Sequence, residues 1–291
     1  MNRRTFIKSV GASAFAATFV ATAADRVEQQ EPQKMKKALQ LGMLPGELSD
    51  PEKFRLARKC GFEGIEAYPM DDLEAAKRLG DAAREAGVPI HSICYGGWKY
   101  PLSDPNPENV EKGLRELENA LRTAKATGAD TVLLVPAVVT ETVGYREAWE
   151  RSHAEIAKVL PQAEELGIVI AVENVWNKFL LSPLEFARYV DEFQSPWLQA
   201  YFDVGNVILF GFSQDWIRTL GKRIRKIHLK DFRRQGYEWV NLREGDVNWQ
   251  EVRRALVEIG YEGYLTPELS AGDETYLTDL SQRIDAILAG G

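Results

Sequence analysis

Short apolar runs alternate with amphipathic stretches from residue 38 to the end of the chain. Apolar runs of this length, bounded by Gly, Pro and polar residues, are typical of β-strands. We therefore predict eight strands, at residues 38–44, 64–69, 89–95, 131–138, 168–175, 198–206, 224–231 and 263–269.

The stretches between these runs have the period of amphipathic helices, most clearly at residues 109–126, 148–165, 184–193, 249–259 and 276–288. Glycines stand where a helix should end before the next strand, at Gly61, Gly87, Gly128, Gly167 and Gly260. Eight such units without a change of composition predict one α/β domain, a closed parallel (β/α)8 barrel of the TIM type. An open Rossmann-like sheet is the alternative, but no G-x-G-x-x-G follows the first run.

The first 24 residues have the composition of an export signal. Arg3, Arg4 and Lys8 precede a weakly apolar run rich in Ala, Gly and Ser, and acidic residues begin only at Asp25. The paired arginines followed by TFIK resemble the twin-arginine (Tat) motif. Because the run is short and lightly hydrophobic, we predict a cleaved signal peptide, an exported periplasmic protein and no stable membrane anchor after cleavage.

The whole chain has the composition of a soluble enzyme, with 45% hydrophobic and 27% charged residues. Residues 25–37 are polar and lack periodicity, so we predict a linker there and a single barrel domain over residues 38–291. The formal net charge of -7 argues against a nucleic-acid partner, because phosphate neutralisation requires a basic face. Cys60 and Cys94 are too few for a disulfide framework, and we expect free thiols.

Four late runs each end in a side chain that can bind a metal: Glu173, Asp203, His228 and Glu268. The carboxyl ends of barrel strands are where active sites form. Alternation places Ala171, Tyr201, Lys226 and Thr266 on the same inward faces, and Val172, Phe202, Ile227 and Leu265 on the outward faces. Any one of the four side chains could instead serve as a helix cap, a core histidine or an ion-pair partner. Three carboxylates and an imidazole on consecutive strand ends favour one divalent ion, Mn²⁺ first, or else Mg²⁺, Co²⁺ or Zn²⁺.

These residues resemble the xylose-isomerase-like barrels, a family that includes sugar-phosphate isomerases and epimerases, ketose 3-epimerases and hydroxypyruvate isomerases. The resemblance runs from residue 38 to the end and is strongest in VEN (172–174), FDVGN (202–206), KIHLKD (226–231) and REGDVNW (243–249). The nearest pattern is that of the pentulose-5-phosphate 3-epimerases. The resemblance implies that Glu173, Asp203, His228 and Glu268 are the metal ligands and that Glu173 and Glu268 are the catalytic acid/base pair.

The chemistry implied is proton transfer beside a carbonyl group. A divalent ion that holds the carbonyl oxygen and the neighbouring hydroxyl stabilises an enediolate. Two glutamates on opposite sides of it remove a proton from one face and return one to the other, which epimerises the carbon. Protonation at the adjacent carbon would interconvert aldose and ketose instead.

Six further residues are candidates for substrate contacts. Arg234 matches a family arginine that holds substrate oxygens, a role that Arg233 could also fill, and Asn206 stands where ketose epimerases often have His. The other four lie on or just after predicted strands and are Glu66, His91, Trp98 and Lys230. Glu66 could instead support the site from behind or form an ion pair, His91 could be packed in the core, and Trp98 is either a plate for a sugar ring or a core or lid residue.

The sequence thus predicts a divalent-metal-dependent sugar isomerase or epimerase, and export favours a free sugar or a keto sugar over a sugar phosphate. The alternative is an exported 3-keto-glycoside lyase or hydrolase that uses the same metal and base. An apurinic-type endonuclease needs more histidines than His91, His153 and His228. A non-catalytic sugar-binding module needs no paired glutamates on a metal. Because barrels of this group are often dimers or tetramers, we expect a homodimer or homotetramer.

Overall fold

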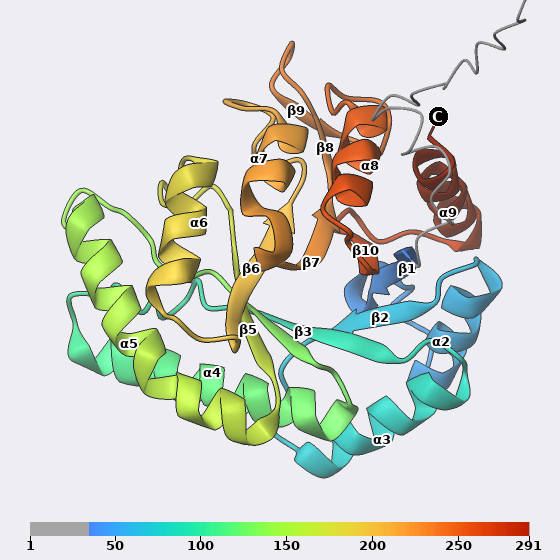
Figure 1. The fold of residues 1–291 in the computed structure, drawn as a ribbon. Coiled ribbons are helices and arrows are strands. Elements are labelled where there is room, and N and C mark those ends of the chain that lie inside the picture. Colours follow the sequence, from blue (N-terminus) through green and yellow to red (C-terminus); the bar gives the residue numbers. More distant parts are fainter. Residues whose placement is uncertain (1–34, 291) are drawn as a thin grey trace, which may run out of the picture. The chain divides into compact units, whose positions relative to one another are not determined.

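The computed structural model describes residues 35–290, and at its centre lies a closed barrel of eight parallel strands (Figure 1). Each barrel strand pairs with the barrel strands before and after it in the chain, and the first pairs with the last. The strands are β1 (Met35–Gln40), β2 (Gly64–Ala67), β3 (Ile90–Gly96), β4 (Thr131–Leu134), β5 (Val169–Glu173), β6 (Leu198–Asp203), β7 (Ile224–Leu229) and β10 (Gly263–Pro267). The predicted barrel is confirmed.

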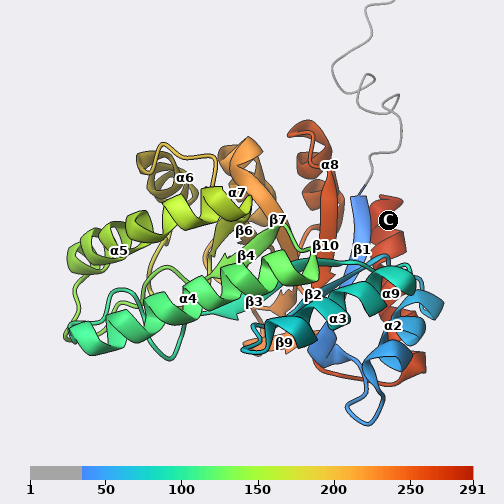
Figure 2. The ribbon, with the colours of Figure 1, turned by 90° about the horizontal axis from the view of Figure 1, so that it is seen from below.

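Helices alternate with the barrel strands and surround them (Figures 1 and 2). They are α2 (Asp50–Lys59), α3 (Leu73–Glu85), α4 (Pro107–Thr127), α5 (Tyr145–Leu166), α6 (Pro183–Glu192), α7 (Ser213–Leu220), α8 (Trp249–Glu258) and α9 (Glu274–Leu288). Two short 3-10 helices are η1 (Leu41–Met43) and η2 (Gly221–Arg223), and an antiparallel hairpin of β8 (Asp231–Arg233) and β9 (Glu238–Val240) follows β7. Within residues 35–290, no helix has the length and apolar character needed to cross a bilayer.

Local signals set where several helices begin and end. The side chain of Asp72 accepts hydrogen bonds from two backbone N–H groups in the first turn of α3, and that of Asn106 accepts one in the first turn of α4. Gly128 and Gly167 end α4 and α5 with φ angles of 86° and 71°, which residues with a Cβ rarely adopt. The glycines that were expected to end these two helices therefore do so.

The barrel wall has the two faces that the alternation predicts. Val172 and Phe202 point outward and are buried in the main core, which fills the space between strands and helices. Ala171 and Tyr201 belong to a separate small apolar cluster inside the barrel. The inward faces of the same strands can therefore carry polar groups toward the barrel axis without disturbing the main core.

The start of the barrel differs from the prediction. β1 begins at Met35, so the last three residues of the predicted linker, residues 35–37, belong to a strand. Lys37 made this segment look like part of a polar tether. Its buried ammonium is 2.7 Å from Ser281 Oγ and 2.7 Å from Asp285 Oδ1, which allows a lysine in the barrel wall. The predicted signal peptide, residues 1–24, lies outside the described residues, as does the linker up to residue 34.

Two further differences concern strand ends and the cysteines. The fourth strand ends at Leu134, earlier than predicted, shortly before Pro136, which has no N–H for the strand ladder. The hairpin of β8 and β9 was not predicted. Cys60 and Cys94 are free thiols, as expected.

Candidate active site

Four side chains converge at the carboxyl ends of the last four barrel strands. One ligand atom from each of Glu173, Asp203, His228 and Glu268 lies within 4.8 Å of the other three. Glu173 and Asp203 are the final residues of β5 and β6, His228 is the penultimate residue of β7, and Glu268 follows β10 directly. The strand ends therefore bring together the four residues that the sequence singled out.

Backbone hydrogen bonds hold these strand ends in register. Asp203 exchanges two hydrogen bonds with the Asn174 side chain, through its N–H (2.9 Å) and its carbonyl oxygen (3.0 Å). The N–H of Glu268 donates to the carbonyl oxygen of Leu229 at 3.1 Å. Gly205 is also needed, because a Cβ at this position would lie 2.5 Å from the Cβ of Lys230. The VEN and FDVGN motifs thus fix the backbone that carries the cluster.

The imidazole of His228 lies between carboxylates on both sides. Its Nδ1 is 2.8 Å from Glu173 Oε1 and 3.4 Å from Glu268 Oε2, inside the cluster. Its Nε2 is 2.8 Å from Glu66 Oε2, on the opposite edge of the ring. Nδ1 is therefore the nitrogen that faces the other potential ligands.

The chemistry of this set fits a divalent cation. Asp203 Oδ2 and Glu268 Oε2 are buried and, among the described residues, accept no hydrogen bond of good geometry. The nearest cation is the ammonium of Lys230, 3.4 Å from Asp203 Oδ2 and 2.5 Å from Glu268 Oε2. Because Asp203, Glu268 and the nearby Glu173 share one ammonium group, a further cation would balance their negative charge. Three carboxylates and one imidazole supply the oxygen and nitrogen ligands that Mn²⁺ and similar ions prefer.

The two glutamates of the cluster have opposite pKa shifts. Burial raises the pKa of Glu173 to about 7 against the opposing effect of His228. Burial also acts upward on Glu268, but His228 and the ammonium of Lys230 outweigh it and lower its pKa to about 2. At neutral pH one carboxyl group can therefore hold a proton while the other accepts one, which suits an acid/base pair.

The other ionisable groups of the cluster are also perturbed. Burial raises the pKa of Asp203. Burial lowers the pKa of His228 and of Lys230, but neighbouring groups reverse both shifts. For Lys230 these are the carboxylates of Asp203 and Glu268; for His228 they include Tyr201, Glu66 and Glu173. Lys230 is therefore a permanent cation beside the carboxylates.

A buried aspartate organises the long loop after β7. Asp231 accepts hydrogen bonds from the N–H groups of Phe232 (2.9 Å), Arg243 (2.9 Å) and Val247 (3.2 Å) and from Trp249 Nε1 (2.9 Å). Asp231 is fully buried, and a Cβ at Gly245 would lie 2.2 Å from its Oδ1. The KIHLKD and REGDVNW motifs thus meet at one carboxylate, which fixes the loop that carries the hairpin.

The hairpin forms an aromatic wall next to the cluster. The indole ring of Trp239 lies 5.6 Å from Lys230 Nζ and packs against Trp176, with ring centroids 5.0 Å apart. A cavity of about 610 Å³ runs from Glu268 and Lys230 past Trp239, Asn241, Ser270 and Tyr276. Sequence reasoning missed this wall, although the segment RQGYEWV, with a glycine between two polar and aromatic runs, is a hairpin signal.

Several predicted substrate contacts are occupied elsewhere. The guanidinium of Arg234 donates to the carbonyl oxygens of Ile208 (2.7 Å) and Gly211 (3.3 Å), so it braces the β6–α7 loop. The side chain of Asn206 is buried and donates to the carbonyl oxygen of Asn174 at 2.8 Å, which makes it part of the scaffold. Trp98 is 51% exposed in the β3–α4 loop. Within residues 35–290, no contact joins Trp98 or Arg234 to the four-residue cluster.

Both Glu66 and His91 are buried beneath the site. Glu66 has no exposed surface, so it cannot touch a substrate. The Nε2 of His91 is 3.1 Å from Thr266 Oγ1, which places the ring one layer below Glu268 in the barrel. Burial lowers the pKa of His91 to about 3, so it stays neutral. Of the six predicted contacts, Lys230 is the one that lines the cavity beside the cluster.

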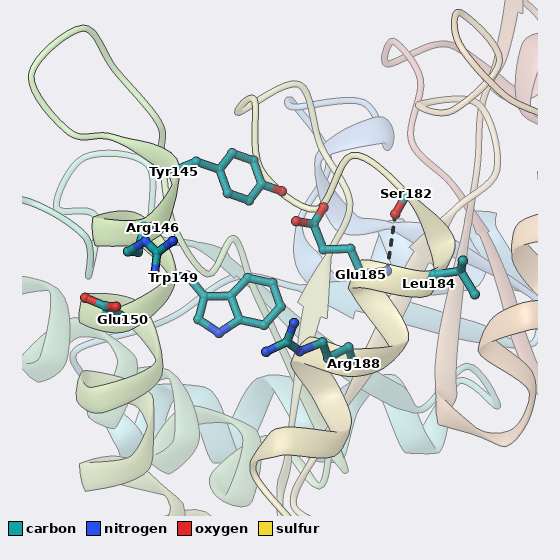
Figure 3. A pocket seen from close by; sticks show the side chains of 8 residues that line it. All are labelled: Tyr145, Arg146, Trp149, Glu150, Ser182, Leu184, Glu185 and Arg188. Carbon is teal, nitrogen blue, oxygen red and sulfur yellow. Dashed lines mark hydrogen bonds between the residues drawn. The ribbon is translucent and has the colours of Figure 1, made fainter.

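A second cavity of about 720 Å³ lies on the outside of the barrel, between α5 and α6 (Figure 3). Its walls include Tyr145, Trp149 and Arg188, which project from the two helices. The indole N–H of Trp149 donates to Glu192 at 2.9 Å, and the guanidinium of Arg188 lies over the Trp149 ring. These groups are partnered within the protein, and the residues that line this cavity include none of the four clustered side chains.

The structure thus places four potential metal ligands at the carboxyl ends of the strands of a closed parallel barrel. The chain belongs to the xylose isomerase-like TIM barrel family, whose model matches residues 54–286. The predicted family is therefore confirmed.

Relatives and solved structures of this kind are named as epimerases. The chain is 27% identical over 244 residues to a putative L-ribulose-5-phosphate 3-epimerase of Escherichia coli K12, covering 78% of this chain and 85% of the relative. It is 23% identical over 251 residues to L-ribulose-5-phosphate 3-epimerase UlaE of E. coli SE11, covering 82% and 88%. The fold matches the crystal structure of E. coli 3-keto-D-glucoside 4-epimerase with a TM-score of 0.73 at 18% identity, over 88% of this chain and 98% of that one. An L-ribulose 3-epimerase structure matches with a TM-score of 0.74 at 18% identity, over 88% and 93%.

Proposed function

We propose that the chain is a divalent-metal-dependent sugar epimerase or isomerase that moves a proton at a carbon beside a carbonyl group. The observation that carries the proposal is the convergence of four ligand atoms within 4.8 Å, three of them carboxylate oxygens and one an imidazole nitrogen. Relatives that share the family are named as epimerases of ribulose 5-phosphate, which supports the same reaction class.

Glu173, Asp203, His228 and Glu268 would hold the metal ion, for which we propose Mn²⁺ first and Mg²⁺, Co²⁺ or Zn²⁺ otherwise. When bound, such an ion acts as a Lewis acid on substrate oxygens and makes the neighbouring C–H more acidic. An apurinic-type endonuclease is disfavoured, because neither of the other two histidines is near the metal ligands. His91 lies below the cluster, and His153, on α5, stacks on the ring of Phe193 at a centroid distance of 3.9 Å. Among the described residues, this leaves a single histidine for a metal.

Glu173 and Glu268 would move the proton. Glu268, with its depressed pKa, is ready to accept a proton at neutral pH, and Glu173, with its pKa near 7, can donate one. The ammonium of Lys230 would hold Glu268 in place through their contact at 2.5 Å. Proton removal by one glutamate and return by the other on the opposite face would invert the carbon.

The cavity favours a free sugar or a keto sugar. Besides Lys230 and Glu268, its wall includes the aromatic rings of Trp239 and Tyr276 and the polar groups of Asn241 and Ser270. Arginine and lysine side chains and free helix N-termini are the usual phosphate ligands. The residues that line this cavity include no arginine, and their lysine, Lys230, already faces two carboxylates. An aromatic ring beside an amide and a hydroxyl suits the alternating faces of a sugar.

The alternative is a lyase or hydrolase that acts on a 3-keto-glycoside with the same metal and base. The fold match to a 3-keto-D-glucoside 4-epimerase makes this substrate class worth testing. Both reactions begin with the same proton removal and differ in whether a neighbouring substituent leaves.

One experiment tests the proposal and its alternative. Purified protein is analysed for bound metal and then incubated in heavy water with free ketoses, ribulose 5-phosphate and a 3-keto-glucoside. Deuterium uptake with formation of an epimer or an aldose–ketose isomer, and without release of aglycone, supports the isomerase. Release of aglycone supports the lyase or hydrolase. Metal-loaded protein that exchanges no substrate proton contradicts both.

We also propose that the protein is exported through its twin-arginine signal and works outside the cytoplasmic membrane as a homodimer or homotetramer. The support for export is the composition of residues 1–24, including Arg3 and Arg4. Amino-terminal sequencing of protein from the periplasmic fraction should find a start near residue 25. Light scattering on the purified protein gives its assembly state.

A further inference from the structure

Glu66 is a buried carboxylate that the proposed reaction does not use. It has no exposed surface, and both of its oxygens are occupied. Oε1 accepts hydrogen bonds from Ser92 Oγ (2.6 Å) and Tyr201 OH (2.7 Å), and Oε2 accepts from Gln40 Nε2 (2.9 Å) and faces His228 Nε2 (2.8 Å). Such an arrangement in the barrel interior requires a reason, because burying a carboxylate is costly even when it is paired.

Four polar groups surround the carboxylate of Glu66 and determine which hydrogen bonds it can form. Three of them, the Ser92 hydroxyl, the Tyr201 hydroxyl and the Gln40 amide, come from β3, β6 and β1 and hold the carboxylate in one orientation. The fourth group is the ring of His228 on β7. Because a carboxylate surrounded by donors only accepts hydrogen bonds, the Nε2 atom of His228 must carry the proton that it donates.

The consequence appears on the opposite side of the imidazole ring. With its proton on Nε2, a neutral ring has its lone pair on Nδ1, which is the atom 2.8 Å from Glu173 and 3.4 Å from Glu268. A carboxylate that accepts a hydrogen bond from the other ring nitrogen of a metal-binding histidine orients the ring and raises the affinity for the metal.

We propose that Glu66 is a positioning residue, which fixes the ring and the tautomer of His228 so that Nδ1 binds the metal. The inference rests on the proposed function, since it assumes that the four-residue cluster binds a metal. A purely structural role, in which Glu66 only ties four strands together, is the competing explanation.

The test compares Glu66→Gln with Ser92→Ala by calorimetric titration of metal-free protein with Mn²⁺. Glu66→Gln keeps the size of the side chain but replaces one of the two carboxylate oxygens by an NH₂ group and removes the negative charge. The affinity for Mn²⁺ should therefore fall by about 10- to 100-fold. Ser92→Ala removes one hydrogen bond of Glu66 (2.6 Å) but leaves its contact with His228, so the affinity should stay within about threefold of wild type. Equal affinity in wild type and a folded Glu66→Gln protein overturns the inference.

A measurement on the wild type keeps the proposal testable even if Glu66→Gln does not fold. The chain has three histidines, so a long-range ¹⁵N–¹H spectrum of Zn²⁺-loaded protein can be assigned to His91, His153 and His228. The inference expects His228 to carry its proton on Nε2 with Nδ1 bound to Zn²⁺. Binding through Nε2 overturns it. If the wild type binds no metal in either experiment, the proposed function fails first.

Discussion

Replacement of Glu268 by Gln is the most direct test of the two-glutamate chemistry. The amide has nearly the shape of the carboxylate but cannot accept the substrate proton. Loss of a general base typically lowers the rate by about 10²- to 10⁴-fold, or about 3–5 kcal/mol in the barrier. We therefore expect kcat for epimerisation to fall by at least about a hundredfold at saturating metal.

The fold should survive this change. The side chain of Glu268 is 35% exposed, and Lys230 keeps Asp203 at 3.4 Å as a counter-charge. We expect the free energy of unfolding to fall by only about 1–2 kcal/mol, since solvent screens part of the lost ion pair. Glu262→Gln, on an exposed residue just before β10, is the matched control and should behave as wild type.

The assay follows deuterium uptake by NMR, starting separately from each epimer in heavy water with saturating Mn²⁺. Because Glu173 remains, one epimer should still exchange its proton while the other should not, and conversion between them should cease. Epimerisation within about threefold of wild type, with metal bound, would refute the role of Glu268, because loss of a base cannot be so small. Loss of exchange from both epimers would show that the two glutamates do not act on opposite faces.

Two further predictions concern binding and stability. Trp239→Ala should raise KM by about tenfold (about 1.4 kcal/mol) with little change in kcat, since the indole forms part of the cavity wall and touches no reacting atom. Steady-state kinetics on the preferred sugar check this prediction, and an unchanged KM contradicts it. Asp130→Asn removes the carboxylate 2.8 Å from the buried ammonium of Lys226 and should lower the unfolding free energy by about 2 kcal/mol, whereas Asp191→Asn, at an exposed ion pair, should cost less than about 1 kcal/mol in urea titrations. Burial raises the pKa of Asp130, but Lys226 outweighs this effect and lowers the pKa on balance. The ion pair should therefore stabilise the fold above the unfolded pKa of about 4, and this stabilisation should be lost as the pH falls. An equal loss of unfolding free energy in both variants at pH 7 contradicts the reasoning.

Much of the fold and the four-residue cluster could be predicted from the sequence because both follow from local pattern. The strand period places Glu173, Asp203 and Glu268 on inward faces, and parallel strands bring their carboxyl ends to one side of a barrel. Contacts that depend on closure of the barrel could not be predicted in this way. Glu66 meets His228 across the interior from β2 to β7, 162 residues apart, and no local signal relates them.

The structure places most of the predicted substrate contacts away from the cavity for a related physical reason. An arginine near the site was expected to bind substrate oxygens, but Arg234 finds two carbonyl oxygens of a neighbouring loop at 2.7 and 3.3 Å. Sequence identifies which side chains can form a hydrogen bond, whereas the geometry of the loops decides which partner each one meets. The aromatic surface at the site came from Trp239, in a hairpin whose position depends on the hydrogen bonds of Asp231.

The hairpin of β8 and β9 is separate in the chain from the four clustered side chains, which makes it a target for engineering. The hairpin begins at Asp231, the first residue of β8, which is fully buried, whereas Glu173, Asp203 and His228 lie on barrel strands and Glu268 follows one. Residues 233–240 are therefore the part of this loop to exchange, with the core residue Phe232 kept, in libraries that test whether the hairpin determines sugar specificity.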